Sequence, residues 1–244
     1  MPNNHSPQQN RLLAALPATD YQRLLPHLDH IQIPSGHIIY KPGDPLHHLY
    51  FPTTAIMSVF YSTETGAAVE TTGVGNEGMI GIAVFMGGRT MPDSAMALCA
   101  GHAYRMPTQV LMNELNRPGG SGALHHLLLR YIQVRMTQIA QTAACNRHHS
   151  LQQRLCRWLL SSLDRAPSNG LPVTQETIAS ALGVRREGVT EAAGRYQRAG
   201  LICYHRGCIT VLDRAGLEKQ ACECYRVVKK EVNRLLALPG MTAN

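Results

Sequence analysis

The sequence predicts an α+β protein with a β-rich first half, a long central helix and a helical C-terminal part. Three observations lead to this prediction. Short apolar runs separated by glycine and proline fill residues 31–107, apolar residues recur at helical spacing over residues 123–147, and a helix-turn-helix pattern covers residues 175–200. The 44% hydrophobic content of the 244 residues is enough to bury a core without disulfides or metals.

The first 120 residues predict a short helix followed by a β domain. The helix is expected over residues 11–28, interrupted near Pro17 and Pro26. The apolar runs that follow are short, rich in Ile, Val, Tyr and Phe, and bounded by turn residues, which is typical of strands in a small antiparallel barrel or sandwich. These runs are HIIY, HHLYF, IMSVFY, AVETTGV, MIGIAVF and AMALCAGHAYRM.

The segment RPGGSG, at residues 117–122, ends the β region, and residues 123–147 predict a long helix. One apolar stripe of this helix consists of Leu129, Ile132, Met136, Ile139 and Ala143. A second apolar surface at its beginning, which we expect to pack on the β domain, consists of Leu124, Leu127, Leu128 and Tyr131. Because the stripe has no obvious partner in this chain, a second copy of the helix would cover it, which predicts a two-fold dimer. The alternative is that both faces pack within one chain.

The charge is distributed unevenly between the two halves. Residues 1–149 hold 9 Lys+Arg and 8 Asp+Glu, whereas residues 150–244 hold 14 and 8, so the net charges are +1 and +6. A basic second half indicates a polyanionic partner, although a solvated basic surface would have the same composition. The sequence has no apolar run of about 18 residues and no signal peptide at its start, and its seven cysteines lack a framework spacing. We therefore expect a cytoplasmic protein with reduced thiols and no membrane partner.

The helix-turn-helix pattern is the most specific motif of the sequence. A helix over residues 150–164, which carries the only tryptophan, precedes it. In QETIASALGVRREGVTEAAGRYQRAG, a small residue stands where two helices would cross, Ala179, and a glycine stands where a tight turn needs a positive φ, Gly183. The four positions that would lock the helices together are apolar: Ile178, Leu182, Val184 and Val189. The next segment, LICYHRGCITVL, predicts a β-hairpin, and a hairpin in this place is a wing.

Together these features resemble the Crp/Fnr family of bacterial transcription regulators, most specifically in GVRREGV and GLICYHRGCITVLDRAGL. The resemblance implies a jelly-roll (double-stranded β-helix) domain of the cyclic-nucleotide-binding type at residues 1–122 and a dimerisation helix at residues 123–149. It also implies a winged helix-turn-helix at residues 150–216 and a C-terminal helical extension at residues 217–244. A member of this family would act as a homodimer on a palindromic operator in double-stranded DNA, with RNA polymerase as a partner.

The resemblance also assigns candidate DNA contacts. Arg186 and Glu187 fall on the family's Arg-Glu pair, and an Arg fork can bond guanine while a carboxylate accepts from cytosine. Thr190 and Glu191 complete the expected base-reading set. The expected phosphate contacts are Thr174, Arg185, Arg195, Arg198, His205 and Arg206. The chain departs from the family at two of these positions: Arg185 stands where Ser or Thr is common, and Glu191 where Arg is common, so the operator should differ from the family's best-known one.

The glycine-rich stretch GNEGMIGIAVFMGGRT falls on the family's phosphate-binding cassette, but the side chains that grip cyclic AMP are missing. Gly81 is present, but Ile82 stands in place of the ribose-binding Glu and Asp93 in place of the phosphate-binding Arg. The remaining residues of this degenerate pocket are Phe85, Gly88, Arg89 and Ser94. We expect no bound cofactor, no cyclic AMP binding at micromolar concentration, and an effector of unknown identity.

Cysteine and histidine residues offer the remaining candidate chemistry. Cys145 and His149, one helical turn apart, could share a metal but do not by themselves make a site. Cys222 and Cys224 are expected on different faces of one helix running from about Leu217 to Leu238, with Cys224 in its apolar stripe. Haem ligation by His47, His48 or His102 stays open, whereas the family's N-terminal iron–sulfur cysteines are not matched, because no cysteine precedes Cys99.

No catalytic motif is present, so the sequence predicts no enzyme. Two alternatives to an effector-sensing DNA-binding regulator remain. One is a redox-, metal- or haem-responsive sensor that uses Cys and His residues, and the other is a protein-interaction module that does not bind DNA.

Overall fold

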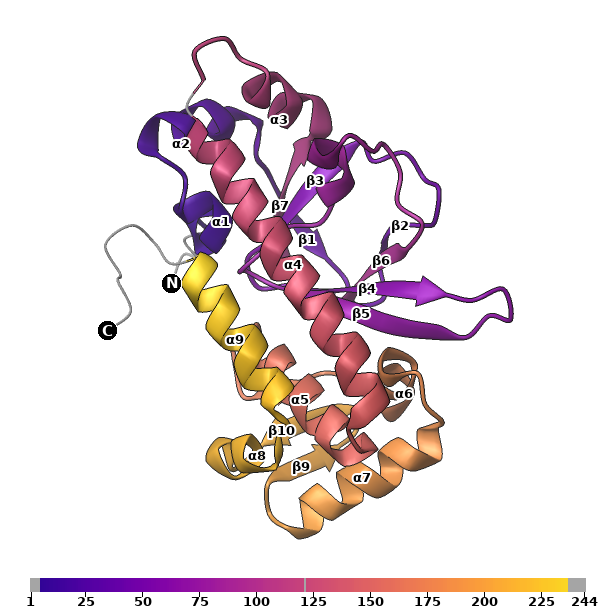
Figure 1. Cartoon of the computed structure of the whole chain (residues 1–244). Helices are drawn as coiled ribbons and strands as arrows, with labels where there is room; N and C mark the ends of the chain where they lie inside the picture. The colour runs from indigo at the N-terminus through magenta and orange to yellow at the C-terminus, as the bar shows by residue number, and fades with distance from the viewer. Residues whose placement is uncertain (1–4, 121, 237–244) are drawn as a thin grey trace.

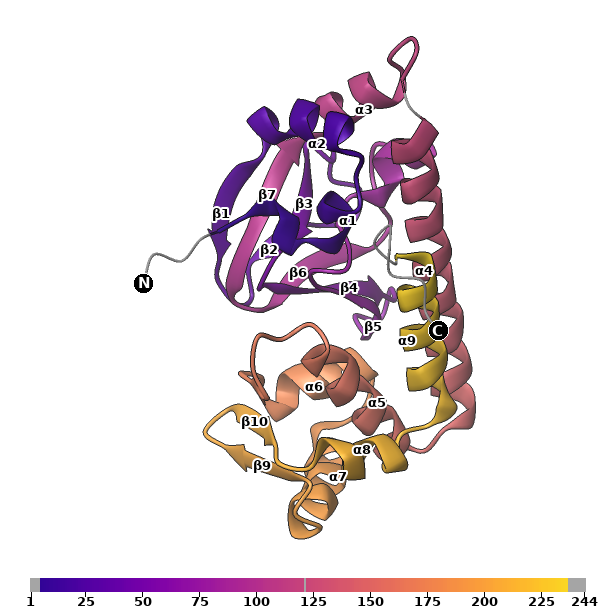
Figure 2. The ribbon, with the colours of Figure 1, turned by 90° about the vertical axis from the view of Figure 1, so that its left-hand side faces the viewer.

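The computed structural model describes residues 5–120 and 122–236. A β-rich lobe and a mainly helical lobe lie on the same side of one long helix, α4 (Gly122–His148), as Figures 1 and 2 show. The mixed α+β class and the predicted order of β domain, long helix and helix-turn-helix are confirmed.

Four short helical segments precede the sheets: η1 (Pro7–Gln9), α1 (Arg11–Ala14), α2 (Ala18–Leu24) and η2 (Leu25–His27). The breaks fall where the prolines predicted them. Asn10 caps α1 by accepting from the backbone of Leu12, and its buried amide donates to the carbonyls of Pro52 and Gly78 at 2.9 and 2.8 Å. These bonds fasten the N-terminal segment to the β domain.

The β domain consists of two antiparallel sheets. One contains, in spatial order, β1 (Asp29–Ile33), β7 (Gly101–Pro107) and β3 (His48–Pro52). The other contains β2 (Ile38–Tyr40), β6 (Ser94–Cys99), β4 (Ile56–Ser62) and β5 (Ala68–Val74). Leu49 and Met106, paired in the first sheet, and Met57 and Ala97, paired in the second, are fully buried in the core between them.

Two helical segments of the β domain differ from the prediction. The run MIGIAVF does not form a strand: Ile80 makes a single bridge to Tyr50, and Ile82–Met86 forms the 3-10 helix η3. Gly81 and Gly87, both left-handed, bound this helix, so the chain turns at each end instead of extending. Helix α3 (Thr108–Leu115), which follows β7 directly, was not predicted.

Helix α4 begins and ends within one residue of its predicted bounds. Its buried apolar residues near the start pack into the core of the β domain, as expected: Leu124, Leu127, Leu128 and Tyr131. Along its C-terminal half, α4 also packs against α9 (Glu223–Leu235), which runs beside it in both views.

The helical lobe contains α5 (Leu151–Leu163), α6 (Gln175–Leu182), α7 (Arg186–Arg198) and α8 (Arg214–Gln220). Its small sheet orders β8 (Gly170–Leu171), β10 (Cys208–Val211) and β9 (Ile202–His205). A reciprocal capping box between Ser150 and Gln153 starts α5.

The predicted single helix from Leu217 is wrong. The chain breaks at Ala221 and Cys222, so that α8 and α9 are separate, and the predicted end at Leu238 lies outside the described residues. Because the helix breaks, Cys222 becomes the N-cap residue of α9 and is buried together with Cys224.

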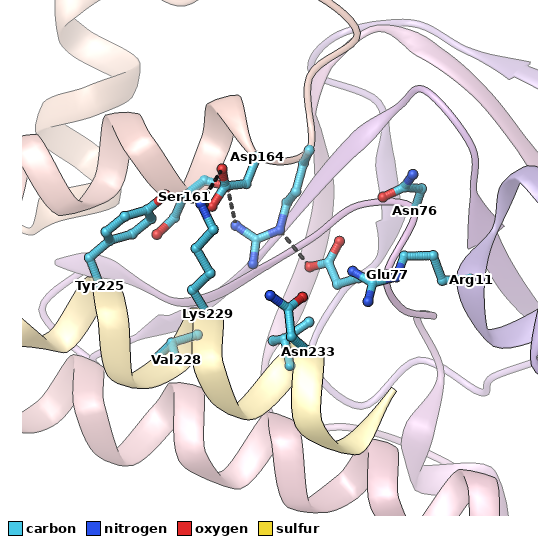
Figure 3. Close-up of a pocket in the computed structure, with 11 residues that line it drawn as sticks. Arg11, Asn76, Glu77, Ser161, Asp164, Tyr225, Val228, Lys229 and Asn233 are labelled. Carbon is cyan, nitrogen blue, oxygen red and sulfur yellow. Dashed lines mark hydrogen bonds and ion pairs between the residues drawn. The ribbon is translucent and has the colours of Figure 1, made fainter. Parts of the chain in front are cut away.

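The two lobes touch through polar contacts around the β5 strand. Arg165, just beyond α5, pairs with Glu77 at 2.6 Å, and both side chains are largely buried. The indole of Trp158 donates to Glu70 at 3.2 Å, and Ser58 donates to the same carboxylate oxygen at 2.8 Å. A cavity of about 190 Å³ opens beside this junction, and Figure 3 shows Glu77 and Asp164 on its walls with Lys229 of α9.

The Glu70 carboxyl gives this junction a pH dependence. Burial raises its pKa, against the hydrogen bonds from Ser58 and Trp158 and the charges of Arg165 and Arg157. The folded protein therefore keeps this proton to a higher pH than the unfolded chain does. The contribution of protonated Glu70 to the stability of the fold is complete below the pKa that this carboxyl has in the unfolded chain. It is lost as pH rises through the pKa of Glu70 in the folded protein.

We expect Glu70→Gln to remove this loss, because the amide stays neutral and its oxygen can still accept both hydrogen bonds. Relative to the wild type, the variant should gain stability as pH rises from 5 to 8, measured by urea unfolding followed through Trp158 fluorescence. Glu64→Gln, on the exposed tip of the same hairpin, is the matched control and should show no such trend. A constant difference between variant and wild type at every pH would contradict the raised pKa.

Candidate nucleic-acid interface

The helix-turn-helix forms as its sequence predicts. Helix α6 ends at Gly183, whose φ of 63° gives the left-handed turn, and the Val184 amide then bonds the Ala179 carbonyl at 3.0 Å. Ala179 is buried where α6 meets α7, together with Ile178, Leu182 and Val189, while Val184 is half-buried. The turn between the two helices therefore depends on the left-handed glycine, and the buried apolar positions join both helices in one core cluster.

Helix α7 has one buried and one exposed face. Val189, Ala192, Ala193 and Tyr196 face the core, and the Tyr196 hydroxyl donates to the Gln152 carbonyl at 2.8 Å. The residues predicted to contact DNA from this helix are all exposed: Arg186, Glu187, Thr190, Glu191, Arg195 and Arg198. The predicted base-reading and phosphate-contacting side chains of α7 thus share its outer surface.

Several of these side chains are engaged with one another. Glu191 and Arg195 form an ion pair at 2.6 Å one turn apart, and Thr190 donates to Gln175 at 2.7 Å. Arg186 and Glu187, in contrast, have no side-chain hydrogen bond or ion pair with any residue in the part of the chain that the structure describes. The start of α7 therefore presents a guanidinium and a carboxylate that are free to bond another molecule.

The ends of both helices explain two further predicted positions. Thr174 is the N-cap of α6, because its hydroxyl accepts from the Thr177 amide at 3.1 Å. Arg185 is the N-cap of α7 and makes no side-chain capping bond, so this helix start lacks the cap that Ser or Thr would supply. Both residues are exposed.

The predicted wing is present as β9 and β10, joined through Arg206 and Gly207, both of which have positive φ. His205 and Arg206 are exposed at its tip. A hollow of about 280 Å³ lies between α6, α7 and the wing, and its lining includes Gln175, Gln197, Arg198 and Tyr204. Gln175, Gln197 and Tyr204 were not singled out in the sequence, because single polar residues there carry no distinguishing pattern.

The residues predicted to form the degenerate effector pocket lie in and around η3 and continue to Ser94 at the start of β6. Gly81 precedes η3 with φ of 105°, Ile82 and Phe85 pack against the apolar core, and Gly88 and Arg89 follow in the exposed turn. Asp93 is buried and accepts a hydrogen bond from Tyr40 at 2.7 Å, and Ser94 bonds the Phe60 carbonyl. Burial raises the pKa of Asp93, while the Tyr40 bond and the nearby Arg135 oppose this rise. An anionic phosphate beside Asp93 would meet a carboxyl group that already accepts a hydrogen bond from Tyr40.

The predicted dimerisation stripe is largely exposed on α4. Leu129, Met136 and Ile139 are 48%, 65% and 45% exposed, Ala143 is exposed, and Ile132 is half-buried. The alternative, that both apolar faces of α4 pack within one chain, is therefore not met between Leu129 and Ala143. Helix α9 covers an adjacent face of α4.

The cysteine and histidine candidates separate into two groups. Cys145 and His149 lie at the end of α4, where Cys222 and Cys224 join them, which corrects the expectation that the latter two point apart. Burial and the neighbouring thiols raise the pKa of Cys224 to about 12. His102 lies in a second group with His5 and His30, while His47 and His48 stand at the start of β3 outside both.

Comparison with known proteins identifies both lobes. Residues 30–117 match the model of the cyclic nucleotide-binding domain, and residues 153–220 match that of the Crp-like helix-turn-helix domain, so that together they cover well over half of the chain. The chain belongs to the Crp/Fnr family. It is accordingly a transcription regulator with a helix-turn-helix DNA-binding domain and a sensor domain of the cyclic-nucleotide-binding type, and this family does not consist of enzymes. The comparison with curated proteins found no match.

Solved structures share the fold. A transcriptional regulator of the Crp/Fnr family from Eubacterium rectale is 20% identical, with a TM-score of 0.67 over 87% of this chain and 98% of its own. FixK2 from Bradyrhizobium japonicum is 14% identical, with a TM-score of 0.65 over 80% and 98%. The c-di-GMP-responsive global regulator CLP from Xanthomonas campestris is 17% identical, with a TM-score of 0.63 over 80% and 99%. At these identities the likeness concerns the fold. Among the described residues, no helix is long and apolar enough to cross a membrane.

The geometry around η3 leads to a prediction about cyclic AMP. Titration of the full-length Crp/Fnr-family protein with cyclic AMP at micromolar concentration should give no binding heat in calorimetry. The reason is that Ile82 offers no hydrogen bond to a ribose, and that Asp93, whose carboxylate accepts from Tyr40, stands where the family resemblance predicts the phosphate-binding Arg. A saturable isotherm with a micromolar dissociation constant would show that other side chains have taken over the two missing contacts.

Proposed function

We propose that the protein is a homodimeric regulator that binds a palindromic operator in double-stranded DNA, with α7 in the major groove and the wing beside the phosphate backbone. The observation that carries this proposal is the pair of exposed side chains of Arg186 and Glu187 at the start of α7, neither of which bonds any other described residue. An Arg fork can bond both O6 and N7 of guanine, and a carboxylate can accept from cytosine N4. Thr190 and Glu191, further along the same exposed face, would contact the neighbouring bases.

The phosphate contacts would surround this base-reading surface. Arg185 and Thr174 lie at the helix starts, Arg195 and Arg198 in the last turns of α7, and His205 and Arg206 on the wing. The Glu191–Arg195 ion pair lets one side chain orient the other, so Glu191 would be held toward the groove while Arg195 stays near the backbone. The net charge of +6 in residues 150–244 supports the attraction of this lobe to DNA.

The dimer would form along α4. Leu129 and Ala143 mark the ends of a stripe about 21 Å long at 1.5 Å per residue, which is long enough for two-fold packing of two such helices. Two recognition helices would then contact operator half-sites related by the same two-fold axis. RNA polymerase is the further partner that membership of the family supports, and the signal sensed by the β domain is one other than cyclic AMP.

Arg186→Ala should reduce the preference for the selected operator over a scrambled one. Loss of one bidentate guanine contact costs about 1–3 kcal/mol, or roughly 5- to 150-fold in the specificity ratio. The operator is first selected from random duplexes with the purified wild type, and both affinities are then measured by gel shift across a range of salt. Arg198→Ala is the matched control: it should weaken both duplexes equally and lower the salt slope by about one.

An Arg186→Ala protein that still discriminates as the wild type does would exclude the proposed base contact. If the wild type itself selects no operator and shows no salt-dependent binding, the lobe is a protein-interaction module instead of a DNA-binding one.

Met136→Asp should shift the protein toward monomer, because a two-fold axis near this position would bring two carboxylates into an apolar interface. We expect the dimer dissociation constant to rise at least about tenfold, which corresponds to 1.4 kcal/mol, as measured by sedimentation equilibrium. Val227→Asp is the matched control, since Val227 is 41% exposed on α9 outside the stripe. Equal dissociation constants for the two variants would place the dimer contact elsewhere.

A further inference from the structure

Four potential metal ligands meet where the helical lobe joins the end of the long helix α4. Cys145 lies in the last turn of α4 and His149 just after it, while Cys222 and Cys224 lie at the break between α8 and α9. The Sγ atoms of the three cysteines and a ring nitrogen of the histidine all lie within 4.8 Å of one another. The three thiols are 3% exposed or less, so they converge on a point shielded from solvent.

The separations within this cluster match those of a tetrahedral zinc site. Zn–S bonds of about 2.3 Å and Zn–N bonds of about 2.0–2.1 Å at tetrahedral angles place two sulfurs about 3.8 Å apart and a sulfur and nitrogen about 3.6 Å apart. The Cys145 and Cys222 sulfurs are 3.6 Å apart, and the Cys224 sulfur is 3.6 Å from His149 Nδ1. The ligand atoms therefore stand at metal-binding distances.

The charged residues around the four ligands also suit a bound metal ion. His149 uses Nδ1 toward the cluster, and its Nε2 lies 3.4 Å from a carboxylate oxygen of Glu223. A carboxylate on the second ring nitrogen is the arrangement that fixes the tautomer of a metal-binding histidine. Arg157 and Arg154 of α5 lie close enough to act on the charge of Cys145. These guanidiniums would offset the net charge of −1 that three thiolates and one imidazole leave on Zn²⁺.

A disulfide explains the cluster less completely. The 3.6 Å between the Cys145 and Cys222 sulfurs is a contact between two thiols, since a disulfide bond is about 2.0 Å long. A bond between any two of the cysteines would also leave the third thiol and the histidine without a role. Only a four-coordinate ion uses all four groups.

We propose that Cys145, His149, Cys222 and Cys224 bind one Zn²⁺ in a closed structural site that fastens the start of α9 to the junction of α4 and α5. Each thiol gives up its proton to solvent when the ion binds, and the imidazole binds in its neutral form. The ion would thereby set the position of the DNA-binding lobe relative to the dimerisation helix. This site is independent of the effector pocket around η3, which lies in the other lobe.

The test uses the full-length reduced protein, stripped with a chelator and titrated with Co²⁺. Binding should saturate at one ion per chain, with thiolate-to-cobalt charge-transfer absorption and the intense visible bands of tetrahedral cobalt, and Zn²⁺ should displace it. Zinc should also raise the thermal midpoint of the stripped protein, because it binds only the folded state. Cys222→Ser and Cys224→Ser should each weaken Co²⁺ binding by at least about tenfold and reduce the charge-transfer band.

Two control variants localise the metal. Cys203→Ser changes an exposed cysteine of the wing outside the cluster and should bind Co²⁺ as the wild type does. His30→Ala disrupts the other group of potential ligands, formed by His5, His30 and His102, and should also leave the thiolate absorption unchanged. Because a buried Cys→Ser change can disturb folding, His149→Gln is measured as well, at a half-buried position and with circular dichroism as the check of fold.

The proposal fails if the stripped wild type, once Co²⁺ is added, shows neither the thiolate-to-cobalt absorption nor the bands of tetrahedral cobalt. It also fails if Cys222→Ser, Cys224→Ser and His149→Gln all bind Co²⁺ as tightly as the wild type. Recovery of the protein with a Cys145–Cys222 disulfide that forms again after reduction, and with no bound metal, would replace the zinc site by a redox pair.

Discussion

The hydroxyl of Tyr131 holds the long helix to the sensor domain. It donates to the carbonyl of Met79 at 2.8 Å and accepts from the amide of the same residue at 2.9 Å, so a buried polar group and a buried backbone segment satisfy each other. The ring closes over Gly78, where a Cβ would lie 2.4 Å from the hydroxyl. Since this contact fixes which face of α4 meets the sensor domain, it also determines that Met136 and Ile139 face outward.

The same turn of the sensor domain is in contact with the DNA-binding lobe. Glu77, next to Gly78, pairs with Arg165 beyond α5, and the Arg165 side chain passes so close to Gly75 that a Cβ there would lie 2.6 Å from it. Residues 75–78 thus touch both α4 and the DNA-binding lobe, and the chain continues from them through Met79 and Ile80 into η3.

The parts that sequence predicted best depend on local residues. Ala179, Gly183 and the apolar positions of the helix-turn-helix act within about 15 residues of one another, so their spacing is visible in the sequence and the structure confirms the motif. The stretch around η3 was predicted less well. IAVF has the composition of a strand, but left-handed glycines at 81 and 87 and the burial of Ala83 and Val84 turn it into a 3-10 helix.

The segment from Gly216 to Leu235 shows why the cluster of Cys145, His149, Cys222 and Cys224 could not be predicted. Residues two apart on a continuous helix project about 200° apart, which would separate Cys222 from Cys224. No proline or glycine between Gly216 and Leu235 marks a break in the sequence. The break at Cys222 accompanies contacts with distant residues: Cys222 meets Cys145, 77 positions earlier, and Cys224 meets His149, 75 positions earlier. Tertiary contacts of this range leave no periodic trace in the sequence. They bring Cys222 and Cys224, which local spacing placed apart, to Cys145 and His149 at the point where the helical lobe leaves α4.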